Sequence, residues 1–344
     1  MTHNSTLDRL RGSIIAGAIG DALGNPVEFM SYPSILSTYG RQGITHFDSR
    51  PHYTDAAGKA VFTDDTQMTL FTAEGLLNVE REDISPIECI EEAYLEWFGT
   101  QTGQKSAEHH HGTLRDIAAL NVRRAPGNTC LSALDSLWRG QQPTNHSKGC
   151  GGVMRVAPIA LWAASGHLSV ESAVLLGGDA AALTHKHPLG FLPAALITAV
   201  IYYLAIDEHP TREHLVDYIR QGEELLTEVY SDLRQEVKSM NRLSELAIEL
   251  AGNALPDIDN ITRLGEGWVG DEALAIALYC AVRHFGNLHQ ALIAAVNHNG
   301  DSDSTGAVTG NILGAAVGYE AIPQHLKDGI EQRELLLTMA DKLG

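Results

Sequence analysis

The 344-residue chain contains few cysteines, and they are widely separated. Cys89, Cys130, Cys150 and Cys280 form no CxxC pair, which argues against a zinc ribbon or a dithiol redox motif. Thiols without a pairing pattern are typical of a reducing compartment. The first ten residues also lack the basic start and apolar stretch of a secretory signal. We therefore expect a cytoplasmic protein.

Basic residues are also scarce. The chain has 24 Lys and Arg against 43 Asp and Glu, which gives a formal net charge of -19. Such a surface repels phosphate backbones and anionic lipids, so we expect neither a nucleic acid nor a membrane as partner. We further interpret the apolar runs as shorter than the roughly 20 residues that span a bilayer. With 44% hydrophobic and 19% charged residues, the composition is that of a globular protein and excludes disorder.

Apolar residues recur at spacings of three and four, whereas strand-like alternation is rare. This periodicity predicts helices. The first apolar stripe covers 7–22 and stops at Gly24 and Pro26. A capping box at Ser85–Glu88 opens another helix. Further stripes cover 131–138, 158–164, 170–183, 189–204, 213–250, 271–285, 288–296, 305–317 and 331–343. The sequence has no fixed-period repeat and no Pro/Ser-rich linker. We therefore predict an all-α fold with one domain over 1–344, from which the polar segment 208–260 projects as a helical protrusion.

Carboxylates and hydroxyls gather in two segments, each directly before a predicted helix. The first is Thr63-Asp64-Asp65-Thr66 and the second is Gly300-Asp301-Ser302-Asp303-Ser304-Thr305. Each cluster alone is explained by helix capping, in which side-chain oxygens accept bonds from free backbone N–H groups. One cap, however, needs only one acid, and both clusters hold two.

The oxygen ligands of these clusters favour Mg²⁺, Mn²⁺ or Ca²⁺ over zinc. If the two clusters converge, their mutual repulsion requires cations. Two divalent ions that share a carboxylate would nearly balance the charge and could polarise a water molecule. Glu28 lies after a helix-ending Gly-x-Pro sequence and is a candidate further acid, or an ordinary surface residue.

Three other segments carry weaker signals. Gly149-Cys150-Gly151-Gly152-Val153-Met154 is a glycine-rich helix start that could approach a phosphate through backbone N–H groups. His185 and His187 lie at a helix end and could donate hydrogen bonds to phosphate or ribose, or be structural. Trp268 lies in a Gly-rich loop and could flank a base or pack in the core. The run 109–111 holds three histidines, which cannot all face one ion on a helix and are interpreted as a solvated loop.

Taken together, the motifs resemble the ADP-ribosylglycohydrolase family. The matching strings are GAIGDALGNPVEF, FTDDTQMTL, GCGGVMRVAPIAL, LTHKHP, GEGWVGDEALAIAL and NHNGDSDSTGAVTGNILGA. They occur in the family's order from about residue 7 to residue 343, and the TDDT and GDSDST strings are the most specific. The resemblance implies an orthogonal helical bundle with two Mg²⁺ or Mn²⁺ ions in a central cleft.

The resemblance also implies roles for individual residues. One ion would be held by Thr63, Asp64, Asp65 and Asp303, and the other by Asp301, Asp303 and Ser304. Glu28 would contact the second ion or the substrate ribose, and either Glu28 or Asp64 would act as base. The remaining implied contacts are to the substrate: Gly149, Gly151, Gly152 and Met154 at the diphosphate, His185 at the terminal ribose or phosphate, and Trp268 near the adenosine.

The implied activity is hydrolysis of the N-glycosidic bond between ADP-ribose and a protein arginine, with free ADP-ribose as product. Family members often carry a further acid between the TDDT and glycine-rich strings, but the stretch here, with Asp116, does not align clearly. Three alternatives stay open: hydrolysis of O-linked serine conjugates or small conjugates, a non-catalytic ADP-ribose-binding relative, and protection against an ADP-ribosyltransferase toxin, either by removing its mark or by binding the transferase itself.

Overall fold

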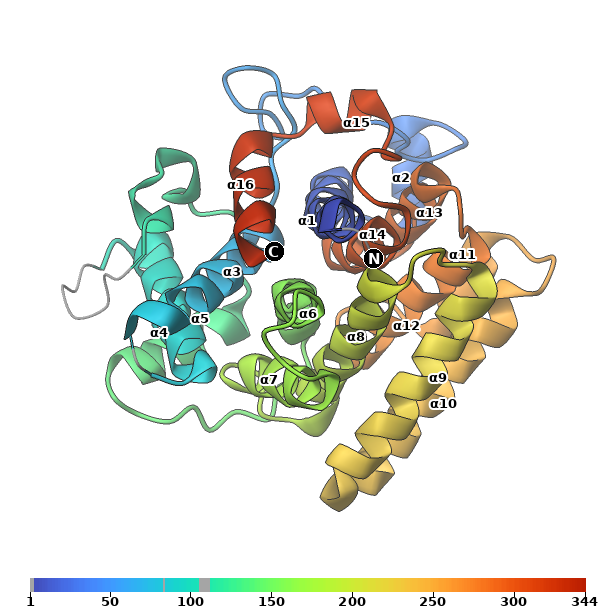
Figure 1. Ribbon diagram of the computed structural model, residues 1–344. Coiled ribbons are helices and arrows are strands. Elements are labelled where there is room, and N and C mark those ends of the chain that lie inside the picture. Colours follow the sequence, from blue (N-terminus) through green and yellow to red (C-terminus); the bar gives the residue numbers. More distant parts are fainter. Residues whose placement is uncertain (1–2, 83, 105–111) are drawn as a thin grey trace.

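The computed structural model describes residues 3–82, 84–104 and 112–344 (Figure 1). This part of the chain is helical, and its only β structure consists of isolated bridges. The predicted all-α fold is therefore confirmed. The α-helices are α1 (His3–Gly24), α2 (Tyr32–Tyr39), α3 (Asp64–Glu82), α4 (Pro86–Thr102), α5 (Asn128–Trp138), α6 (Ala157–Ala164), α7 (Val170–Ala182), α8 (Pro188–Ile206), α9 (Arg212–Val229), α10 (Arg234–Ala251), α11 (Asp257–Leu264), α12 (Gly270–Arg283), α13 (Leu288–Val296), α14 (Ser302–Val317), α15 (Gln324–Gly329) and α16 (Arg333–Leu343).

The helices α1 and α14, from opposite ends of the chain, pack against each other at the centre of the molecule (Figure 1). Glycines make this close approach possible, because a Cβ on Gly20 would collide with the backbone of Gly306. Near the C-terminal end of α1, a Cβ on Gly24 would likewise meet the backbone of Ser302. This packing holds the loop after α1, with Glu28, beside the first turn of α14.

Several helix boundaries differ from the sequence prediction. The predicted continuous stripe over 213–250 is split into α9 and α10, because the chain turns through a short 3₁₀ segment at Ser231–Leu233. The two helices lie side by side and extend away from the body (Figure 1). The short helices α2, α11 and α15 were not predicted, since six to eight residues carry too little periodicity to be recognised.

The interpretation that all apolar runs are too short for a bilayer is wrong for α8. Its 19 residues are long and apolar enough to cross a membrane by length and composition. In the structure, however, 78% of its most apolar window is buried, where it contacts α6, α7 and α9. Burial on nearly all sides explains the uniform apolarity, as expected for a central helix of a helical body.

Candidate metal and substrate site

A cavity of about 340 Å³ lies where the two acidic clusters meet. Its lining includes every site residue predicted from the sequence except Thr63 and Gly152. The predicted residues that line it are Glu28, Asp64, Asp65, Gly149, Gly151, Met154, His185, Trp268, Asp301, Asp303 and Ser304. The cavity therefore brings together segments that are separated by up to 276 positions in the sequence.

The first acidic cluster forms the start of α3, but its aspartates do not cap the helix. Asp21, from α1, does so: its carboxylate accepts hydrogen bonds from the backbone N–H groups of Thr63 at 2.9 Å and Thr66 at 3.0 Å. The carboxylates of Asp64 and Asp65 are thereby left available for the cavity. The Asp64 carboxylate accepts a bond from the backbone N–H of Gly127 at 3.1 Å. The capping interpretation is therefore right for Thr63, whose hydroxyl accepts from the backbone N–H of Asp65 at 3.3 Å, and wrong for Asp64 and Asp65, because Asp21 supplies the carboxylate cap.

The second cluster both caps a helix and lines the cavity. Asp301 is the N-cap of α14, and its Oδ1 accepts from the backbone of Ser304 at 3.3 Å. Its other oxygen, Oδ2, accepts from the Cys150 thiol at 2.6 Å. Burial raises the pKa of that thiol well above its usual range, so Cys150 is a neutral donor here. The capping and metal-binding interpretations are compatible for Asp301.

Carboxylates from the loop after α1, the start of α3 and the start of α14 converge at the cavity. Glu28, Asp301 and Asp303 each place an oxygen within 4.8 Å of the other two. Asp64, Asp65, Asp301 and Asp303 are at most 5% exposed. Burial, and then the charge of Asp303, raises the pKa of Asp65 and of Asp301 well above the usual range. Burial, followed by the same neighbour, raises the pKa of Glu28 to about 11.

This donor set fits divalent cations. Among the residues that the structure describes, five carboxylates and no Lys or Arg line the cavity. The buried Oδ2 atom of Asp65 has no hydrogen-bond partner, which is costly unless another group takes that position. Hard oxygen ligands of this kind suit Mg²⁺ or Mn²⁺. The residues of the lining are therefore compatible with a divalent-cation site, whereas the ligand set expected from the sequence stays a prediction.

The glycine-rich segment 149–152 makes room for a histidine. A Cβ on Gly149 would lie 3.0 Å from the His185 Nε2 atom, and one on Gly151 would lie 2.9 Å from its Cε1 atom. Hydrogen bonds fix the Nδ1 side of the ring. Nδ1 of His185 lies 2.9 Å from the Thr184 hydroxyl oxygen, which accepts a hydrogen bond from Arg155 at 2.6 Å. Burial, followed by the charge of Arg155, lowers the pKa of His185 to about 3. The ring is neutral and can serve as a hydrogen-bond donor or acceptor.

Two predicted residues lie outside the cavity lining. A Cβ on Gly152 would collide with the carbonyl of Gly190 and the side chain of Ala181, so this glycine permits close packing against α7 and α8. Thr63 is buried directly before α3, and its hydroxyl accepts from the backbone of Asp65 at 3.3 Å. His187, considered as a substrate contact, instead caps α8 with its Nδ1 atom.

Two aromatic rings stand at the edge of the cavity. Trp268 stacks on Phe29 with ring centroids 5.3 Å apart, and both side chains are exposed. Core packing of Trp268 is thus excluded. Phe29 has a positive φ of 63°, a strained conformation for an aromatic residue that is typical of functional sites.

The sequence interpretation missed the segment 125–129, which also lines the cavity. Gly127 offers a backbone N–H to Asp64 there, and no motif identifies such a group in advance. Asp21 has a structural role, since its carboxylate accepts hydrogen bonds from the start of α3. The histidine run 109–111 lies outside the described residues.

Comparisons with known proteins show the family of the chain. A family model described as ADP-ribosylglycohydrolase matches residues 2–344. The chain belongs to the ADP-ribosylglycohydrolase family. An uncharacterized protein of Archaeoglobus fulgidus is 30% identical, with 98% of this chain and 96% of that protein covered. ADP-ribosylhydrolase ARH3 of mouse is 25% identical over 96% of this chain and 90% of its own.

A second named relative specifies a linkage. ADP-ribosylarginine hydrolase Tri1 of Serratia proteamaculans is 25% identical, covering 99% of this chain and 80% of that protein. Among solved structures, an ADP-ribosylglycohydrolase-related protein complex aligns with 99% of this chain and 98% of that one, at a TM-score of 0.63 and 21% identity. That likeness confirms the fold.

Proposed function

We propose that this ADP-ribosylglycohydrolase releases ADP-ribose from modified arginine side chains in the cytosol, with two Mg²⁺ or Mn²⁺ ions in the carboxylate cavity. The observation that carries the proposal is the convergence of five carboxylates, with no Lys or Arg among the described residues of the lining. Bound divalent ions would supply Lewis-acid stabilisation and a water molecule of lowered pKa.

Charge balance favours arginine as the linked residue. Two divalent ions balance four of the five negative charges in the lining and leave one. A guanidinium group released during hydrolysis must carry a positive charge, and the remaining carboxylate would attract it. A released serine hydroxyl is uncharged, so the remaining carboxylate would not attract it in this way. One relative is named as an arginine-directed hydrolase, whereas the name ADP-ribosylhydrolase ARH3 specifies no linkage.

The residues of the chain divide the remaining tasks. Asp64, Asp65 and Thr63 on one side, and Asp301 and Ser304 on the other, would hold the ions, with Asp303 between the two sets. Their scaffold is rigid, because both acidic clusters are fixed at the first turns of long helices.

The substrate would be held by groups around the acids. Glu28 is the least buried of the five carboxylates and lies on a loop, which suits a group that takes or returns a proton. The backbone of Gly149 and Gly151, with His185, would contact the diphosphate and ribose. Trp268 would flank the adenosine.

The test compares two substrates. Peptides bearing ADP-ribose on arginine or on serine are incubated with the chain, with Mg²⁺, Mn²⁺ or EDTA, and released ADP-ribose is quantified by chromatography. The proposal predicts metal-dependent release from the arginine peptide, at least tenfold faster than from the serine peptide. Preferential release from serine would overturn the arginine assignment, and release undiminished by EDTA would overturn the metal assignment.

A protective role against an ADP-ribosylating toxin would follow from the same activity. Incubating a lysate modified by an arginine-specific ADP-ribosyltransferase with the chain should remove the modification when Mg²⁺ is present. A metal-free variant that still blocks the transferase would instead support direct binding of that enzyme.

A further inference from the structure

Three histidines from distant parts of the sequence meet on another face of the molecule. The ring centroids of His289 and His325 are 5.5 Å apart, those of His46 and His289 are 5.9 Å apart, and those of His46 and His325 are 6.3 Å apart. His46 lies in the loop after α2, His289 in the first turn of α13 and His325 in α15. None of the three belongs to the carboxylate cavity.

The spacing of the rings is close to that of a zinc site. With Zn–N distances of about 2.0–2.1 Å and tetrahedral angles, three coordinating imidazole centroids lie about 5 Å apart. The observed distances are larger by about 0.5 to 1.3 Å. Among the described residues, only the group of Glu28, Asp301 and Asp303 already has its ligand atoms within 4.8 Å of one another. The histidines would therefore need small ring rotations, which His46 and His325 can make because both are exposed.

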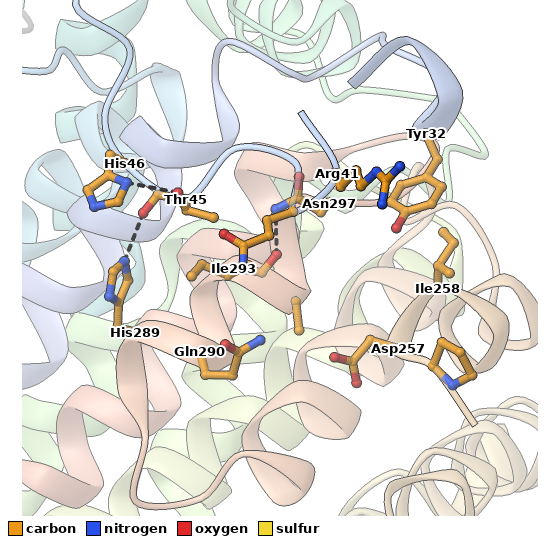
Figure 2. A pocket seen from close by; sticks show the side chains of 13 residues that line it. Tyr32, Arg41, Thr45, His46, Asp257, Ile258, His289, Gln290, Ile293 and Asn297 are labelled. Carbon is orange, nitrogen blue, oxygen red and sulfur yellow. Dashed lines mark hydrogen bonds between the residues drawn. The ribbon is translucent and has the colours of Figure 1, made fainter. Parts of the chain in front are cut away.

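Hydrogen bonds already orient two of the rings. Figure 2 shows Thr45 between His46 and His289, bonded to both. Nε2 of His289 lies 2.9 Å from the Thr45 carbonyl oxygen, which can only accept, so this nitrogen carries the hydrogen. In the neutral ring, Nδ1 then keeps a free lone pair. A metal-binding histidine characteristically donates its other N–H to a backbone carbonyl in this way.

The second ring has a similar arrangement. Nδ1 of His46 lies 2.8 Å from the Thr45 hydroxyl, which leaves Nε2 available. Both rings also border a cavity of about 440 Å³, so an ion at this position would be reached from solvent. Three protein nitrogens with an open fourth position are the ligand set of many zinc sites that keep a bound water.

We propose that His46, His289 and His325 bind one Zn²⁺ ion, separate from the hard-cation site of the carboxylate cavity. Imidazole nitrogens select zinc over magnesium, whereas the carboxylates prefer Mg²⁺ or Mn²⁺. The bound ion would join three segments of the chain. It would fix the loop after α2 onto α13, where the Asn297 side chain already makes two bonds to the Ile44 backbone.

The experiment uses the full chain carrying His109→Ser, His110→Ser and His111→Ser, because that histidine run could bind zinc by itself. The metal-free protein is titrated with ZnCl₂ in excess Mg²⁺ against a chromophoric chelator. Single variants His46→Ala, His289→Gln and His325→Ala are compared with His209→Ala, which removes an exposed histidine outside the cluster.

The proposal predicts one zinc ion per chain and a loss of affinity of about tenfold or more in each cluster variant, with the His209→Ala control within twofold of the parent. Equal affinities in all variants would overturn it. Zinc binding that is lost on Cys150→Ser but kept in the cluster variants would also overturn it, by placing the ion in the carboxylate cavity. The Gln variant keeps a donor for the Thr45 carbonyl, which separates a lost ligand from a disturbed loop.

Discussion

Replacing Asp65 with Asn should stabilise the metal-free protein and destroy its response to magnesium. The buried Oδ2 atom of Asp65 has no hydrogen-bond partner, and such an orphaned buried acceptor costs about 1–3 kcal/mol. An amide nitrogen at that position can donate to a neighbouring carboxylate and adds no charge. We therefore expect Asp65→Asn to gain about 1–2 kcal/mol of unfolding free energy without metal.

The sign of the pH dependence follows from the same group. Burial, and then Asp303, raises the pKa of Asp65 in the folded state, whereas the unfolded carboxyl titrates near pH 4. Above pH 4 the folded protein binds more protons than the unfolded one, so its stability falls as pH rises, by up to about 1.4 kcal/mol per pH unit for each such group. The advantage of the variant should therefore widen from pH 5 to pH 8.

Saturating Mg²⁺ should reverse the order of stability, so that the wild type unfolds with a higher free energy than Asp65→Asn. At a Mg²⁺ concentration of 100 times the Kd, binding adds about 2.7 kcal/mol to the wild type, and the variant should gain little of this. Urea unfolding of both proteins at pH 5 and pH 8, with EDTA or Mg²⁺, measures the stability without metal, its pH dependence and the gain from Mg²⁺. A variant that is destabilised equally with and without Mg²⁺ would refute the reasoning, since it would assign Asp65 a purely structural role.

Three further substitutions test individual contacts. Glu28→Gln should keep Mg²⁺ affinity within a few-fold but reduce kcat by about 10²–10⁴ if Glu28 transfers a proton, and unchanged kcat would exclude that role. Gly151→Ala should weaken binding of ADP-ribose about tenfold in calorimetry, because its Cβ would crowd the His185 ring; unaltered affinity would show that this glycine is not needed for substrate. Asp21→Asn should cost about 1–2 kcal/mol in urea unfolding, because the amide replaces one accepting oxygen at the start of α3, and a neutral result would contradict the capping role.

The sequence predicts the helical class and most of the cavity because both depend on local patterns. Helices follow from the spacing of apolar residues. The acids at the starts of α3 and α14 are recognisable because two carboxylates exceed what one cap requires. That these starts face each other depends on the packing of α1 and α14, where Gly20 and Gly306 touch, and only the family resemblance indicated it.

Other features could not be predicted because they depend on tertiary contacts. Asp21 caps α3 across 42 residues, which frees Asp64 and Asp65, and no local rule distinguishes that arrangement from capping by Asp64 or Asp65 themselves. The contribution of Gly127 is a backbone N–H, which every non-proline residue has. Gly152 was predicted to contact the substrate, but in the structure its lack of a Cβ allows helices to pack closely. A glycine required for packing and one required for a ligand look alike in sequence.

The most direct test of the account counts bound Mn²⁺ and measures release of ADP-ribose from a modified arginine peptide in the same preparations. Wild type and Asp303→Ala are compared with Asp341→Asn, which removes an exposed carboxylate paired with Arg11. The account predicts two Mn²⁺ ions per chain in the wild type and the control, and a joint loss of ions and turnover in Asp303→Ala. Full metal-dependent turnover in Asp303→Ala would contradict it.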